Sequence, residues 1–108
     1  MIKIDLLLHH YLRTLQVRLL TAIRDNVARD LAGPIIMVRH EAVAIRAFSD
    51  IARTPETNVN RYLDDHDLVL LGELDDDTLQ ITPQNRVLMH GSALRAALEA
   101  EARNPSQE

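Results

Sequence analysis

The sequence predicts one mainly helical domain that carries a small β-hairpin and pairs with a second copy of itself. A chain of 108 residues has the length of a single domain. Apolar residues recur at helical spacing through its first third, and two strand-like segments flank an acidic turn at residues 75–77. The domain is expected to cover residues 1–103, followed by a disordered tail at 104–108.

The composition is that of a globular protein, with 46% hydrophobic and 26% charged residues. The absence of cysteine excludes disulfides, thiol nucleophiles and cysteine-ligated zinc. No apolar run reaches the roughly 18–20 residues that span a bilayer. Asp5, His9 and His10 interrupt the apolar start, and no small-residue cleavage site follows, which argues against a signal peptide. We therefore expect a cytoplasmic protein without a membrane partner.

Residues 1–33 are predicted to form one long helix. Apolar residues recur there in steps of three and four, and Gly33-Pro34 then provides a helix cap and a stop. The periodic stretch from Ile4 to Leu31 alone would form a helix about 42 Å long, more than the rest of the chain can cover. A partner chain is the natural cover, so the expected homodimer interface consists of Leu8, Leu12, Leu15, Leu19 and Ile23.

Two further helices are predicted within residues 41–65, after an apolar run at 34–39 that fits either a strand or a helical turn. The first covers Glu41 to Arg53, with its apolar residues on one face. The second begins at Thr54-Pro55, because threonine fits the N-cap and proline fits the first helical position, and it continues to about Asp65.

A β-hairpin is predicted over residues 68–82. The apolar run LVLLGEL, an Asp-Asp-Asp turn and the alternating segment TLQIT follow one another there. Thr82-Pro83 repeats the pattern of a helix start, which predicts a final helix over residues 83–103 with Val87, Leu88, Leu94 and Leu98 as its apolar positions.

This order of elements resembles winged helix-turn-helix regulators of the MarR type. AFSDIARTPETNVNRYLDDHDLVLL resembles their helix-turn-helix, and LLGELDDDTLQITPQNRVLM resembles their wing and the helix after it. The resemblance covers about residues 41–98 and implies a dimer that binds double-stranded DNA, with residues 55–65 as the recognition helix in the major groove. Two features depart from the pattern: Arg53-Thr54 leaves hardly any turn, and the wing tip offers aspartates where such wings usually offer Arg or Lys.

Polar side chains on the second helix are the candidate base-reading residues, since Asn can pair with adenine and Arg with guanine. They are Thr57, Asn58, Asn60 and Arg61. Basic residues spaced seven apart are the candidate phosphate contacts, namely Arg39, Arg46 and Arg53. For both sets the alternative is a solvated helix face.

Nothing in the sequence supports catalysis. Only three glycines are present, without a phosphate-binding loop, and the five histidines are scattered without a metal-binding spacing. We therefore expect no enzyme, no metal and no cofactor; an effector ligand is left open. The leading hypothesis is a homodimeric DNA-binding transcriptional regulator. The alternative is a winged-helix protein–protein interaction module that does not bind DNA. The net charge of −4 and the Asp-Asp-Asp wing tip favour the alternative, whereas the polar face of the second helix and the mildly basic remainder of the chain favour DNA binding.

Overall fold

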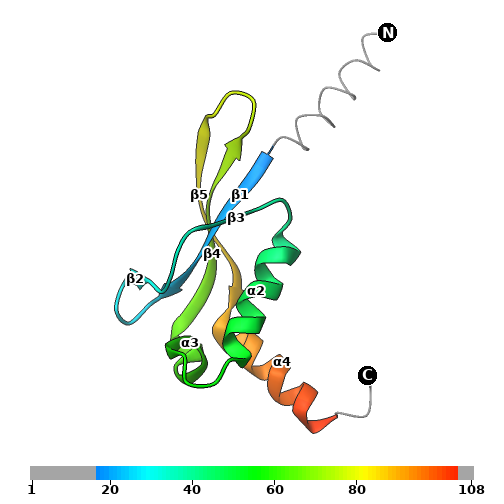
Figure 1. Cartoon of the computed structure of the whole chain (residues 1–108). Helices are drawn as coiled ribbons and strands as arrows, with labels where there is room; N and C mark the ends of the chain where they lie inside the picture. Colours follow the sequence, from blue (N-terminus) through cyan, green and yellow to red (C-terminus); the bar gives the residue numbers. More distant parts are fainter. Residues whose placement is uncertain (1–16, 105–108) are drawn as a thin grey trace.

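The computed structural model describes residues 17–104, and strands make up as much of it as helices do (Figure 1). Strands β1 to β3 come first, then the helices, then the long hairpin β4–β5 and a last helix. In chain order the elements are β1 (Val17–Asp25), β2 (Asp30–Leu31), β3 (Ile36–Val38), α2 (Glu41–Arg53), α3 (Asn58–Arg61), the 3₁₀ helix η1 (Leu63–Asp65), β4 (His66–Asp75), β5 (Ile81–His90) and α4 (Gly91–Arg103).

The strands form one antiparallel sheet of five strands in the order β2-β1-β4-β5, with β3 also paired to β1. Strand β4 lies in the middle and pairs with β1 from Val17↔Asp75 to Asp25↔His66. Its apolar run is typical of a strand that is covered on both faces. Strand β5 pairs with β4 alone and forms one edge of the sheet.

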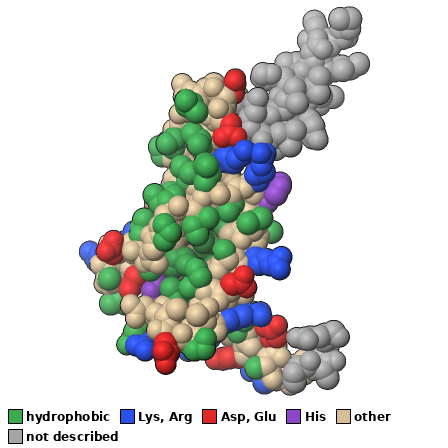
Figure 2. Space-filling model, viewed as in Figure 1, with side chains coloured by type: hydrophobic (Ala, Val, Ile, Leu, Met, Phe, Trp, Pro, Cys, Tyr) green, Lys and Arg blue, Asp and Glu red, His purple; other side chains and the backbone are tan. Residues whose placement is uncertain are grey.

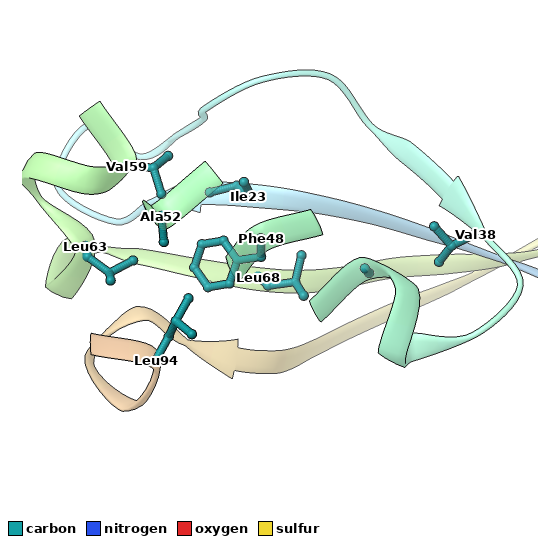
Figure 3. Packing of buried hydrophobic residues seen from close by; sticks show 9 residues of the cluster. Ile23, Val38, Phe48, Ala52, Val59, Leu63, Leu68 and Leu94 are labelled. Atoms are coloured by element: carbon teal, nitrogen blue, oxygen red, sulfur yellow. The ribbon is translucent and has the colours of Figure 1, made fainter. Parts of the chain in front are cut away.

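Helix α2 packs on one face of this sheet, which we call the helix face. Ala44, Phe48 and Ala52 recur every four residues and are its buried positions. Figure 3 shows the Phe48 side chain in the middle of the core, among residues from the strands and the other helices. The core cluster consists of Ile23, Val38, Ala44, Phe48, Ala52, Val59, Leu63, Leu68 and Leu94.

The predicted mainly helical fold, with its long helix over residues 1–33, is wrong. Residues 17–25 form β1, and Ile23 lies in the core while Leu19 packs against it, so these two residues are not available as a dimer seam. Positions 19 and 23 fit a strand period of two as well as a helical period, and pairing with β4 decides between them. Leu8, Leu12 and Leu15 lie outside the described residues.

The predicted recognition helix over residues 55–65 is also wrong. Thr54 ends α2, since its backbone N–H donates to the carbonyl of Ile51, and Glu56 has a positive φ of 70° that interrupts the helix. Thr57 is the N-cap, three residues after the predicted one, and accepts a hydrogen bond from the backbone N–H of Asn60. Helix α3 therefore covers only Asn58–Arg61.

The prediction of a hairpin is confirmed, but not its bounds of 68–82, because its strands are His66–Asp75 and Ile81–His90. Residues 83–90 therefore form a strand instead of the start of the last helix. An edge strand tolerates Pro83 because one side of the strand needs no backbone donor. Helix α2 has the predicted bounds, Glu41–Arg53. None of the helices within residues 17–104 has the length and apolar character that a membrane crossing requires.

Candidate protein interface

Strand pairing divides the side chains of the sheet into two faces. Ile23 pairs with Leu68, which pairs with Met89, and all three belong to or pack against the core under the helices. The alternate positions lie on the opposite side, which we call the outer face. Its apolar residues are Leu20, Ala22, Met37, Val69, Gly72, Leu74, Ile81, Pro83 and Val87.

The outer face is apolar except at its ends. One row joins Met37, Leu20, Gly72 and Pro83, and the next joins Ala22, Val69 and Val87. The third row joins Arg18, Leu74 and Ile81, so it is charged at its β1 end. None of these residues belongs to the core cluster. An antiparallel sheet with one face in water usually carries polar side chains there. Both faces of this sheet are thus largely apolar, whereas the helices pack on only one of the two faces.

Four of the apolar outer-face residues remain exposed, and Pro83 is one of them. Ile81 has 59% of its surface accessible, Met37 has 52% and Val87 has 40%, whereas Ala22 and Val69 between them are buried. Figure 2 shows hydrophobic side chains extending along the β4–β5 hairpin and across the middle of the molecule, with charged side chains mainly around the periphery. Exposed apolar residues that adjoin one another mark interaction surfaces more often than single ones do.

Charged side chains stand only at the two ends of the outer face. At one end the Arg18 guanidinium lies 3.0 Å from the Asp76 carboxylate, and at the other end Arg24 is the register partner of Asp67. By contrast, the polar strand residues Glu73, Thr82 and Arg86 are on the helix side of the sheet. There the Arg86 guanidinium donates a hydrogen bond to the Glu41 carboxylate at 2.7 Å, and this bond raises the pKa of the guanidinium.

Gly72 lets two strands approach closely in the middle of the outer face. A Cβ at this position would lie 2.9 Å from the backbone oxygen of Thr82 and 3.4 Å from the Cγ2 atom of Ile81. Both neighbours belong to β5, and one of them is backbone that cannot rotate away. The glycine therefore holds β5 against β4 and leaves a position without a side chain between Leu20 and Pro83.

Two of the predicted base-reading side chains make hydrogen bonds within the protein. The Thr57 hydroxyl oxygen accepts from the backbone N–H of Asn60 at 3.0 Å, and the hydroxyl lies 3.0 Å from the carbonyl oxygen of Thr54 as its donor. The side-chain amide of Asn60 donates to the carbonyl of Ala52 at 2.7 Å. These groups join α3 to the end of α2. Asn58 and Arg61 are exposed.

The predicted phosphate contacts do not form one free basic surface. Arg46 and Arg53 are exposed on α2, but Arg53 lies 2.8 Å from Glu101 on α4, and Arg39 precedes the helix. Arg61 lines a depression of about 270 Å³ with two acidic residues, Asp64 and Asp65. Acidic side chains thus accompany the basic ones in this region.

A buried histidine lies where η1 ends and β4 begins. His66 Nδ1 lies 2.8 Å from the Tyr62 carbonyl oxygen, and Nε2 lies 3.7 Å from the Asp25 carboxylate. The backbone N–H of Ala28 is the main cause that lowers the pKa of Asp25. Within residues 17–104, no three His, Asp or Glu side chains lie close enough to hold a metal ion.

The outer face is not predicted by the sequence pattern. The one available signal is the continuous apolar run LVLLGEL, which is typical of a strand buried on both sides. Its partner strands are hidden in residues 17–25 and 83–90, whose patterns also fit helices.

Comparison with known proteins gives one match. A model of the family described as Phage ORF5 protein matches residues 19–94. No curated protein and no solved structure matches the chain. The matched span contains the whole outer face and most of the core, so both surfaces of the sheet lie within it.

Proposed function

This chain belongs to the Phage ORF5 protein family, and we propose that it works as a protein-binding module whose contact surface is the outer face of the sheet. The observation that carries this proposal is that three adjoining rows of register partners are apolar except for Arg18 at the end of the third row. A sheet with two apolar faces is stable when both are covered. The helices cover one face, and a protein surface is the apolar cover for the other.

The exposed side chains are large enough to make such a contact favourable. Full burial of a Met, Val or Ile side chain contributes about 1.5–3 kcal/mol. Because Met37, Ile81 and Val87 still expose about half of their surface, a partner that covers them would gain about 1 kcal/mol from each. These three residues are the proposed anchors, and the buried Ala22 and Val69 lie in the same row as Val87.

Sequence-specific DNA binding has less support than protein binding. Helix α3 has four residues, and the side chains of Thr57 and Asn60 are engaged within the protein. The net charge is −4, and the hairpin tip carries three consecutive aspartates that phosphate would repel. A recognition helix needs a longer exposed polar face than this segment offers.

The proposal is tested by capture with matched variants. The purified chain is immobilised and exposed to a lysate of cells that produce it. Captured proteins are identified by mass spectrometry and retested in pure form. The Met37→Lys/Val87→Lys double variant should lose the partner. Val43→Lys should retain it, because Val43 is 51% exposed on α2, as exposed as Met37 but far from the outer face.

Binding of fragmented duplex DNA at low and moderate salt completes the test. The wild-type chain should show no salt-dependent affinity. Binding that weakens steeply with salt and is lost in Arg46→Ala and Arg61→Ala would overturn the proposal in favour of DNA binding. Equal capture by the double variant and by Val43→Lys would also overturn it, since the contact would then lie elsewhere.

A further inference from the structure

We propose that a small apolar cavity on the helix face of the sheet binds a short aliphatic group. The cavity has a volume of about 40 Å³ and lies between the sheet, helix α2 and the segment 32–36 that leads into β3. It is on the opposite side of the sheet from the outer face, so it does not depend on the proposed function. Its walls, its polarity and its size together define the ligand.

Three elements of the fold contribute core side chains to the cavity. Ile23 of β1 and Leu68 of β4 come from the sheet, and Phe48 comes from the middle of α2. Figure 3 shows these three side chains close together between the sheet and α2. Ala47 and Ile51, one helical turn apart on α2, also line the cavity and are half-buried. A substitution at either of these two positions changes the cavity without removing a fully buried residue.

The segment 32–36 forms the remaining wall and is attached to β1 at both ends. The backbone N–H of Ala32 donates to the Ile23 carbonyl at 2.8 Å, and the Thr21 hydroxyl donates to the Ile36 carbonyl at 2.9 Å. Two residues between these attachments line the cavity. The segment cannot settle against α2 without losing these hydrogen bonds, so the cavity belongs to the folded structure.

The cavity is lined almost entirely by apolar side chains. Thr21 is the one polar side chain among the described residues that line it, and its hydroxyl already donates to the Ile36 carbonyl. The Ile23 carbonyl likewise has a donor, the backbone N–H of Ala32. A bound water needs about two to four polar partners, and apolar cavities without them stay dry and take apolar ligands. The part of the ligand that enters the cavity therefore carries no hydrogen-bonding group.

The volume of the cavity limits the ligand to a few carbon atoms. One water-sized probe occupies about 10–15 Å³, so a cavity of about 40 Å³ accommodates about three atoms of that size. An aromatic ring needs more space, since an apolar cavity that binds benzene measures about 150 Å³. A branched aliphatic end such as an isopropyl group fits. Such a group belongs either to a small free molecule or to a valine or leucine side chain of a protein partner.

Methyl NMR of the whole chain under xenon pressure tests the proposal, because xenon binds dry apolar cavities without hydrogen bonds. The methyl signals of Ile36 and Ile51, which line the cavity, should shift with xenon until binding is saturated. Those of Ile81 and Val87 are the internal control, since these side chains are exposed on the outer face. The absence of a saturable shift at Ile36 and Ile51, or shifts of the same size at all four residues, would overturn the proposal.

A matched pair of variants locates the site. Ala47→Leu places a larger side chain in the cavity and should abolish the xenon response. Ala42→Leu makes the same change at an exposed position of α2 outside the lining and should retain the response. Ile51→Ala enlarges the cavity and should increase the response, which gives a second measurement if Ala47→Leu does not fold. A response that neither Ala47→Leu nor Ile51→Ala changes would contradict the proposed site.

Capture of partner proteins distinguishes the two sources of the aliphatic group. Capture that is lost with Ala47→Leu and retained with Ala42→Leu assigns the group to a side chain of the partner. Capture that both variants retain, together with a saturable xenon response, assigns it to a free small molecule. The proposed function is judged separately, because it depends on the outer-face variants at Met37 and Val87 and not on the response to xenon.

Discussion

Asn60→Ala tests how residues 54–61 are used, because sequence and structure give this side chain different roles. As a base-reading residue on an exposed helix it could be removed with little effect on stability. In the structure its amide donates to the Ala52 carbonyl at 2.7 Å, in the last turn of α2. A lost hydrogen bond costs about 0.5–1.5 kcal/mol, and an acceptor left without a donor costs about 1–3 kcal/mol. Because Asn60 itself is exposed, water can replace part of the lost hydrogen bond. We therefore expect Asn60→Ala to lower the free energy of unfolding by about 1–2 kcal/mol.

Thermal unfolding followed by circular dichroism measures this effect. For a domain of this size, about 1 kcal/mol corresponds to about 4–8 °C in melting temperature, so Asn60→Ala should melt about 4–16 °C lower than the wild type. Asn58→Ala is the matched control, since Asn58 is exposed on the same short helix and should change stability by less than about 0.5 kcal/mol. Equal melting temperatures for the two variants would refute the structural role of Asn60.

Two further substitutions test how α4 packs against η1 and β4, and how the last residue of β1 contributes to stability. Gly91→Ala would place a Cβ in overlap with the carbonyl oxygens of Leu63 and His66, so urea unfolding should show a loss of at least about 3 kcal/mol; stability close to that of Ser92→Ala would contradict this packing. The lowered pKa of Asp25 means that its stabilising effect is present above the unfolded pKa of about 3.9 and is lost as pH falls through the folded value. Asp25→Asn should therefore lose less stability than the wild type when the pH is lowered below about 4, and parallel stability curves would exclude that role.

The sequence pattern predicts the structure correctly where local pattern and tertiary packing agree. Helix α2 has the predicted bounds because its apolar residues recur at helical spacing and face a single neighbour, the sheet. The hairpin was predicted because an apolar run and an acidic turn follow each other, and Asp75 does form that turn, accepting hydrogen bonds from the backbone N–H groups of Asp77 and Thr78.

It failed where one pattern fits two structures. Leu19 and Ile23 satisfy a helical period, yet with Thr21 they also satisfy a strand period, and only the pairing with β4 selects the strand. Thr82-Pro83 resembles a helix start, but β5 is an edge strand, where proline is tolerated. In both cases a long-range contact overrides the local preference.

The outer face could not be predicted for a related reason. Its rows exist only once Leu20, Val69 and Val87 belong to adjoining strands, and two of the three strands concerned had been interpreted as helices. The candidate site residues from the sequence were polar side chains at helical spacing, whereas the surface that the fold assembles is apolar and built from residues far apart in the chain.

The rate of methionine oxidation tests the central claim, that the outer face is a binding surface, most directly. Met37 is exposed on the outer face, while Met89 is half-buried and packs against the core on the helix face, so it is an internal control. Dilute hydrogen peroxide followed by peptide mass spectrometry measures both rates. We predict that Met37 reacts faster than Met89 in the isolated chain and slows markedly when the captured partner is bound, with Met89 unchanged. A complex in which Met37 still reacts at its unbound rate would contradict the account.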